Sequence, residues 1–110
     1  MSDGYVVVLS TFPLDGEIAK TARTLVEERL AACVNILPEM TSIYRWQDAI
    51  EEGAERQVII KTARERVPAL WERLRSLHPY DVPEFIMLPI VDGNEAYLKW
   101  IGDATDNADG

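Results

Sequence analysis

The chain has 110 residues, 47% of them hydrophobic, and its nineteen acidic and eleven basic residues give a net charge of −8. This length corresponds to one domain with one hydrophobic core. The negative charge repels phosphate backbones, so nucleic acids and anionic membranes are disfavoured as partners. The sequence has no apolar run of about 20 residues and no basic start followed by an apolar stretch. We therefore expect no membrane span and no signal peptide, and a cytoplasmic protein.

The first elements predicted are a strand and an amphipathic helix. Residues 5–11 (YVVVLST) form a nearly continuous β-branched run, which is typical of a strand covered on both faces or central in a sheet. Asp15 is placed to cap the following helix, and Glu17 falls in its first turn. The apolar positions of this helix repeat every 3.6 residues and are Ile18, Ala22, Leu25, Val26 and Leu30.

A long hairpin is predicted next. Residues 32–37 and 41–46 form one extended segment, which Pro38 interrupts. Because proline cannot donate a hydrogen bond within a sheet, we expect an edge position or a β-bulge there. A loop over residues 47–53 then leads to the next strand, at residues 57–62.

The start of the second helix is marked by two conflicting signals. Thr62 and Glu65 have the spacing of a capping box, but a helix that began at Thr62 would place Pro68 in its interior. An interior proline costs about 3 kcal/mol and a lost cap about 1 kcal/mol, so the later start is predicted. This helix ends at His78, and the apolar run over residues 83–91 forms the last strand.

Together these elements predict an α+β fold of the ferredoxin-like, split βαβ type (βαββαβ) with a short carboxy-terminal helix. Residues 1–102 form the single domain, and residues 103–110 a polar, flexible tail. The last strand is expected at a sheet edge, since prolines stand at both of its ends. An exposed apolar edge calls for a partner chain. Candidate anchors for self-association are the aromatic residues Trp46, Tyr97 and Trp100.

The stretch HPYDVPEF contains the only histidine, His78. An imidazole can shuttle protons or bind a borderline cation, and Asp81 and Glu84 are close in sequence. A histidine at a helix end can instead have a purely structural role beside the free carbonyl groups. One imidazole cannot hold a transition metal tightly, so a metal site needs carboxylates or ligands from a second subunit.

Two further residues have both a structural and a functional interpretation. Cys33, the only cysteine, stands between apolar residues of a strand and has the setting of a buried small side chain; its functional interpretation is a soft copper ligand. Lys61 is the only charge in its apolar strand and must reach solvent or a carboxylate, for which Glu84 is a candidate. Classical catalysis is poorly supported, because no second histidine stands beside a Ser or Cys and no glycine-rich phosphate loop occurs.

Five segments, in this order and spacing, resemble the CutA divalent-cation tolerance family: EERLAACVNILP, TSIYRWQDAIEE, IIKT, LHPYDVPE and YLKWI. The resemblance covers residues 5–101. It implies a homotrimer of ferredoxin-like subunits with an architecture similar to that of PII signalling proteins, in which hairpins and carboxy-terminal segments cross subunit boundaries.

The resemblance also implies a response to divalent metal ions and, in some members, copper(II) binding. The copper ligands proposed in such relatives match Ser10, Leu77 and His78, and only His78 is retained as a ligand type, so weak copper binding is expected. No cofactor is required. Proposals of a functional cleft between subunits carry over to Cys33, Lys61 and Glu84.

Three functions therefore remain open at this point. The first is a trimeric, cation-responsive protein with weak metal binding near His78. The second is a PII-like scaffold or sensor whose inter-subunit cleft holds a small ligand or a protein. The third is an enzyme that uses His78 with Asp81 or Glu84, and it ranks last, so the chain is predicted not to be an enzyme.

Overall fold

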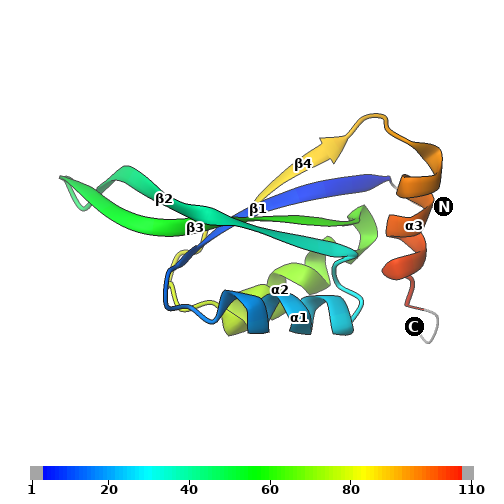
Figure 1. Cartoon of the computed structure of the whole chain (residues 1–110), viewed down its shortest axis with the longest axis horizontal. Coiled ribbons are helices and arrows are strands. Elements are labelled where there is room, and N and C mark those ends of the chain that lie inside the picture. Colours follow the sequence, from blue (N-terminus) through cyan, green and yellow to red (C-terminus); the bar gives the residue numbers. More distant parts are fainter. Residues whose placement is uncertain (1–3, 108–110) are drawn as a thin grey trace.

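The computed structural model describes residues 4–107 and has a four-stranded antiparallel sheet, with two helices packed under one face (Figure 1). In chain order the elements are β1 (Tyr5–Pro13), α1 (Ile18–Glu27), β2 (Cys33–Trp46), β3 (Ala49–Ala63), a 3₁₀ turn (Arg64–Arg66), α2 (Val67–Leu77), β4 (Ile86–Ile90) and α3 (Glu95–Ala104). The strand order is β2-β3-β1-β4, with every neighbouring pair antiparallel. This order confirms the predicted α+β, ferredoxin-like fold and the edge position of the last strand.

The two faces of the sheet differ in what covers them. Along β1, the buried Val6 and Val8 alternate with the partly exposed Val7 and Leu9, because successive side chains of a strand point to opposite faces. The buried set joins α1 and α2 in one core: Val6, Val8, Phe12, Ile18, Leu25, Leu30, Ala31, Val58, Ile60, Leu70 and Leu74. We call the other side the open face; its apolar residues include Val7, Leu9, Ile59, Ile86 and Leu88.

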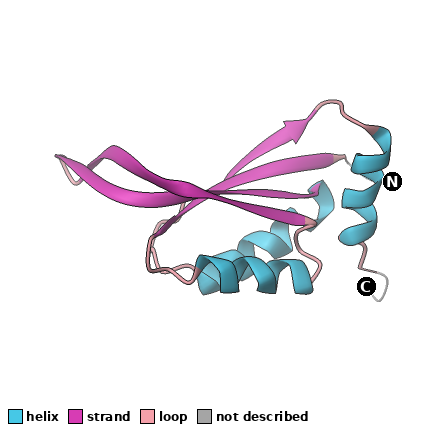
Figure 2. Cartoon of the chain, viewed as in Figure 1, coloured by secondary structure: helices cyan, strands magenta, loops and turns pink. Residues whose placement is uncertain are grey.

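The paired strands β2 and β3 extend well beyond the rest of the molecule as a twisted arm (Figure 1; Figure 2). The pairing shifts register between Ile36 and Glu39, which confirms the irregularity predicted at Pro38. The prediction of a loop over residues 47–53 was wrong. The strands are joined by Gln47 and Asp48 alone, with φ of 49° and 65°, and β3 begins at Ala49. Two left-handed residues match the twist of the flanking strands, but Gln-Asp lacks the Asn-Gly signature that reveals such a turn in a sequence.

The two helices of the core begin as the local sequence permits. The predicted cap at Asp15 was wrong: α1 begins after Glu17, which is left-handed (φ 52°) and makes no capping hydrogen bond through its side chain. A turn in which the Gly16 N–H donates to the Pro13 carbonyl delays the helix start. The late start of α2 is confirmed, since it begins at Val67 with proline in its first turn.

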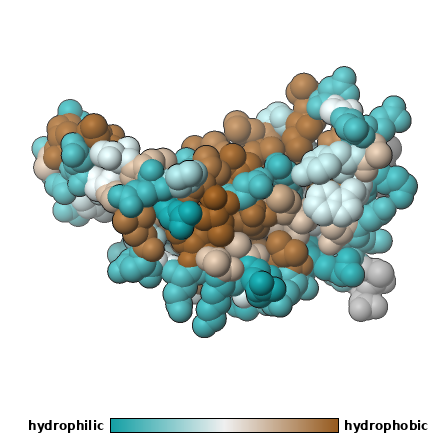
Figure 3. All heavy atoms as spheres, in the orientation of Figure 1, coloured by the Kyte–Doolittle hydropathy of each residue, from teal (hydrophilic) through white to brown (hydrophobic). Residues whose placement is uncertain are grey.

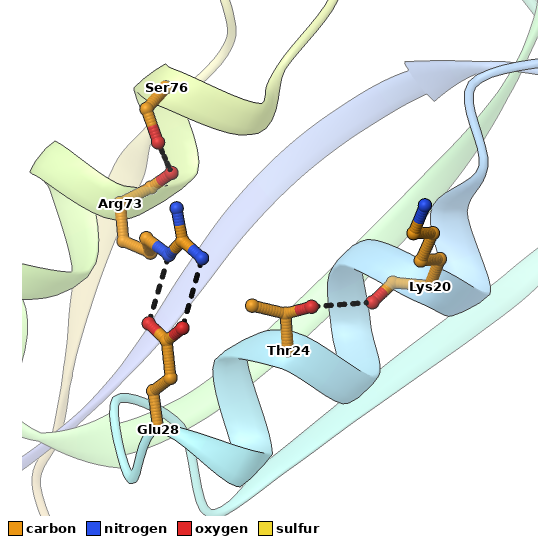
Figure 4. A network of polar contacts seen from close by, with 5 residues as sticks. All are labelled: Lys20, Thr24, Glu28, Arg73 and Ser76. Carbon is orange, nitrogen blue, oxygen red and sulfur yellow. Dashed lines mark hydrogen bonds and ion pairs between the residues drawn. The ribbon is translucent and has the colours of Figure 1, made fainter.

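Helices α1 and α2 are connected at their exposed sides by an ion pair. Arg73 donates from Nε and Nη2 to the two carboxylate oxygens of Glu28, each at 2.9 Å (Figure 4). The hydrogen bond with Glu28 raises the pKa of Arg73. Nearby, the Thr24 hydroxyl donates to the Lys20 carbonyl, and the Ser76 hydroxyl to the Arg73 carbonyl. These surface contacts fix the relative orientation of α1 and α2 more than they stabilise the fold, because exposed ion pairs are weak.

Helix α3 lies at the end of the molecule opposite the tip of the arm (Figure 1). Its start is capped by Asn94, whose side-chain oxygen accepts from the N–H groups of Ala96 and Tyr97. The boundary expected at residue 102 was too early, because α3 runs to Ala104 and the buried Thr105 hydroxyl donates to the Ile101 carbonyl. Of the predicted tail, residues 108–110 lie outside the described residues. None of the helices described here is long and apolar enough to cross a membrane.

Ser10 places a hydroxyl group in the core without a partner. Among residues 4–107, its Oγ is the buried side-chain oxygen or nitrogen that makes no hydrogen bond, and the residue is 0% exposed. A buried hydroxyl group that loses its hydrogen bonds to water and gains none within the protein destabilises the fold. We expect Ser10→Ala to raise the free energy of unfolding by about 1 kcal/mol. Urea denaturation at a fixed protein concentration measures this change.

Thr62 offers a matched control for this prediction. It is equally buried on β3, but its hydroxyl donates to the Leu30 carbonyl at 2.8 Å. Thr62→Val keeps the shape and leaves that carbonyl unpaired, so this variant should lose about 1–3 kcal/mol. A loss of stability in Ser10→Ala comparable to that of Thr62→Val would contradict the prediction.

Candidate functional site

A groove of about 680 Å³ lies between the hairpin arm and the loop that joins α2 to β4. Residues of β1, of both strands of the arm and of the loop line it: Thr11, Tyr44, Trp46, Glu55, Pro79, Tyr80, Asp81, Val82, Pro83 and Glu84. Aromatic rings and carboxylates therefore face the same space. Such a lining can receive a cation or a flat polar group.

His78 stands at the base of this loop, as the residue that ends α2. Its side chain is buried, with 9% exposed, and its ring stacks on Phe12 at 4.2 Å between centroids. The Tyr80 backbone N–H donates to Nδ1 at 3.1 Å, and Nε2 lies 2.8 Å from the Thr11 carbonyl oxygen. Because a backbone N–H can only donate, Nδ1 carries no proton, and Nε2–H donates to Thr11. The structural interpretation placed His78 beside the free carbonyl groups of its own helix, whereas the carbonyl that its ring reaches belongs to Thr11 of β1.

Two further contacts attach the loop to the sheet. The Tyr80 hydroxyl donates to Glu55 Oε2 at 2.7 Å, and Gln57 Nε2 donates to Glu84 Oε2 at 2.9 Å. The same Gln57 nitrogen donates to the Ser10 carbonyl at 2.6 Å. Burial, and then the bond with Glu55, raise the pKa of Tyr80, so the phenol stays protonated. One wall of the groove is therefore held by side chains of β3 and by backbone carbonyl groups of β1.

This geometry does not supply the catalytic pair considered from the sequence. The His78 ring nitrogens are engaged with Thr11 and Tyr80, and Glu84 accepts from Gln57. General acid–base chemistry requires a group within hydrogen-bond reach of the proton that it transfers. The pairing of His78 with Asp81 or Glu84, which the lowest-ranked function requires, is not formed; His78 and Glu84 instead make contacts that fix the loop.

The residues around His78 do not supply the ligands that the divalent cation implied by the resemblance needs. A metal needs a ligand lone pair, and that of His78 Nδ1 is already used by the Tyr80 N–H. Ser10 is fully buried, and Leu77 has no donor atom. Within residues 4–107, no group of three or more His, Cys, Asp or Glu side chains could together hold a metal ion. The expected ligand set around His78 does not fit a transition metal in this structure.

The burial of His78 predicts a dependence of stability on pH. Burial lowers its pKa below the ordinary value of 6.5, while the Thr11 bond and Glu55 oppose this shift. The unfolded chain therefore binds a proton at a higher pH than the folded chain. The contribution of neutral His78 to stability should be complete above about pH 6.5 and be lost as the pH falls from there toward the folded pKa.

Denaturation midpoints between about pH 8 and about pH 5 measure this loss. The comparison with His78→Gln isolates it, because the chain has one histidine and glutamine does not titrate. The wild type should lose more stability than the variant as the pH falls. Equal slopes for the two proteins would sink this prediction.

The proposed cleft residues are separated into two places. Cys33 and Lys61 are directly opposite each other on β2 and β3, on the open face. Lys61 Nζ lies 3.4 Å from the Tyr97 hydroxyl of α3 and 5.7 Å from the centre of its ring. Glu84 instead binds Gln57, which is four residues from Lys61 along β3, a distance of roughly 13 Å in an extended strand. The expected pairing of Lys61 with Glu84 is therefore not formed.

The aromatic residues expected at an interface are at the two ends of the molecule and are exposed. Trp46 lies next to the turn of the arm, where Ile43 and Ile50 are also exposed. Tyr97 and Trp100 pack together on α3, with ring centres 5.3 Å apart. Figure 3 shows apolar surface at the tip of the arm and around β4, whereas the helices below the sheet are largely polar. The exposure of Trp46, Tyr97 and Trp100 leaves these side chains accessible to a partner chain.

Several residues of the groove were not found from the sequence. Tyr80 was part of the HPYDVPEF stretch but was given no role, although both its N–H and its hydroxyl fix the loop. Glu55 and Gln57 stand in a polar segment of β3 that resembles an ordinary exposed strand. Their contacts with the loop arise only from the tertiary structure, because the partners are 27 and 25 residues apart in the sequence. Tyr44 gave no local signal either.

Comparisons with known proteins agree on one family. The profile of the family described as CutA1 divalent ion tolerance protein matches residues 6–104. The divalent-cation tolerance protein CutA of Thermus thermophilus is 53% identical over 100 residues, which are 90% of this chain and 96% of that protein. A solved structure of the Thermus thermophilus protein has a TM-score of 0.89 at 49% identity, with 93% and 99% of the two chains covered. The structure of CutA1 from Oryza sativa has a TM-score of 0.91 at 40% identity, with 96% and 97% covered.

The matched residues include every strand and helix of the fold except the first residue of β1. Relatives at these identities, matched over nearly their whole length, share a common domain. The chain belongs to the CutA1 divalent ion tolerance protein family.

Proposed function

We propose that this chain acts as a homotrimeric divalent-cation tolerance protein of the cytoplasm. The open face of the sheet is the observation that carries the proposal. It presents a layer of aliphatic side chains, of which Ile86 and Leu88 on β4 are exposed in the single chain. A surface of this kind marks an association site. The resemblance implies a trimer, and the arm and α3 add aromatic anchors at the two ends.

Binding, and not catalysis, is the proposed mode of action. The net charge of −8 would attract divalent cations, including copper(II). Surface carboxylates would bind these cations weakly. No step of the proposal depends on a tightly held metal, because the His78 ligand set does not fit one. The tolerance role follows from the name of the family and of the Thermus thermophilus relative.

Two measurements test this proposal. Light scattering should give three times the chain mass of 12.4 kDa. In bacteria that lack their own family member, expression of the chain should raise the copper(II) concentration that stops growth. A monomeric mass would contradict the assembly, and unchanged growth in copper would contradict the tolerance role; the two results are independent of each other.

The groove favours a second candidate function, that of a trimeric PII-like scaffold or sensor. Its volume of about 680 Å³ suits a small ligand, and its lining of aromatic rings and carboxylates offers directional contacts. A screen of metabolites by thermal shift, with a chelator present, distinguishes this candidate from the first. A ligand that stabilises the metal-free protein, and loses its effect in Trp46→Ala, would favour the sensor.

A further inference from the structure

The imidazole of His78 has no lone pair available for a metal, and this follows from the direction of its two hydrogen bonds. Nδ1 accepts from the Tyr80 N–H, and Nε2–H donates to the Thr11 carbonyl. Binding through Nδ1 would leave the Tyr80 N–H without its acceptor. Binding through Nε2 would require loss of the proton and would leave the Thr11 carbonyl unpaired. Either change leaves a desolvated backbone group unsatisfied.

Access to the ring is also restricted. One face stacks on Phe12 at 4.2 Å, the Tyr80 ring lies 4.9 Å away, and 9% of the residue is exposed. A metal ion would have to enter with further ligands, and the described residues contain no cluster of metal-binding side chains. The charged group that faces His78 is Glu55 of β3, which is already hydrogen-bonded to the Tyr80 hydroxyl.

We propose that His78 in this chain is a neutral positioning residue that fixes the loop over residues 79–85 against β1, and that it is not a ligand for divalent cations. Its two ring nitrogens connect Thr11 on β1 with Tyr80 in the loop, and Tyr80 continues the connection to Glu55 on β3. The loop that lines the groove is thereby attached to two neighbouring strands of the sheet. This inference holds whether or not the proposed trimer forms.

The direct test is NMR of the wild-type protein with ¹⁵N-labelled histidine, to which zinc(II) is added. The chain has one histidine, so each ring-nitrogen signal is assigned without ambiguity. At neutral pH we expect an unprotonated Nδ1 and a protonated Nε2, with both shifts unchanged as zinc(II) is raised to millimolar concentration. A zinc-dependent change of either ring-nitrogen signal in the folded protein would overturn the proposal.

A series of variants separates the two hydrogen bonds. The side-chain oxygen of His78→Asn can accept from the N–H two residues later, as in an Asx turn, and so replaces Nδ1. His78→Gln can reach Thr11 but not the Tyr80 N–H, and His78→Ala reaches neither. Hydrogen exchange at the Tyr80 amide should stay slow in the Asn variant and be on the order of tenfold faster in the Gln and Ala variants. Equal exchange rates in all three variants would contradict the positioning role.

Copper(II) titration of the wild type and His78→Asn completes the test, because asparagine retains an acceptor for the Tyr80 N–H and removes the imidazole. Equal affinities, or no measurable binding by either protein, support the proposal. A loss of copper affinity of tenfold or more in His78→Asn, with the Tyr80 amide still protected, would make His78 a ligand and refute it. Light scattering of the same samples reports the assembly separately, so a failure of the trimer is not confused with a failure of this inference.

Discussion

Replacing Leu88 with aspartate is expected to convert the proposed trimer into monomers. Leu88 is at the centre of β4 and lies opposite Val7 on the open face, with 45% of its side chain exposed in the single chain. In the proposed assembly that exposed part becomes buried. A carboxylate placed there has no partner, and its desolvation costs several kcal/mol in each subunit. Light scattering should give the mass of one chain.

Leu14 provides the matched control. It is 46% exposed, but it belongs to the turn after β1, outside the open face. Leu14→Asp makes the same chemical change at the same exposure, and the trimer mass should be retained. If both variants stayed trimeric, the open face would not be the interface. If both became monomers, the effect would not be specific to Leu88.

Phe12→Ala is expected to produce the largest loss of stability within one subunit. Phe12 is 2% exposed and stands at the end of β1, where it belongs to the core and also stacks on the His78 ring. Removing a buried phenyl ring leaves a cavity and costs about 3–5 kcal/mol. The ring also shields His78, so the pKa of His78 should move back up toward 6.5. Urea denaturation and histidine NMR measure the two effects.

Phe12→Leu separates packing from the aromatic contact. Leucine fills most of the same volume, so this variant should lose less than about 2 kcal/mol. If Phe12→Ala lost no more stability than Phe12→Leu, the cavity left by the phenyl ring would have closed by repacking. A pKa of His78 that stays low in Phe12→Ala would show that other groups keep the imidazole out of water.

Much of the fold could be predicted because local and global signals agree. The late start of α2 followed from the cost of an interior proline, and the irregularity of β2 followed from the missing N–H of Pro38. The errors concern backbone conformation at single residues. Glu17, Gln47 and Asp48 all have positive φ; aspartate alone of these residue types is enriched in that conformation, and a single Asp does not identify the turn. The tertiary structure imposes those angles, so the helix start and the turn were misplaced.

The candidate site was harder to predict, because it consists of contacts between distant parts of the chain. His78 and Glu84 were recognised as chemically capable, but their partners come from β1 and β3. A hydrogen bond to a backbone carbonyl, such as that of Thr11, leaves no trace in a sequence. The same residue types therefore predicted a ligand or a catalytic pair, whereas the geometry supports a fixed loop.

The turn of Gln47 and Asp48 limits how the arm can change length. With two residues between the strands, the pairing of β2 with β3 near the tip is fully determined by the turn. Inserting one residue in each strand would preserve that pairing. Every side chain between the insertion and the tip would, however, move to the opposite face of the arm. Only two residues per strand, which lengthen the arm by about 7 Å, keep both the pairing and the faces. Insertions or deletions can therefore change the length of the arm only in steps of four residues, two in each strand.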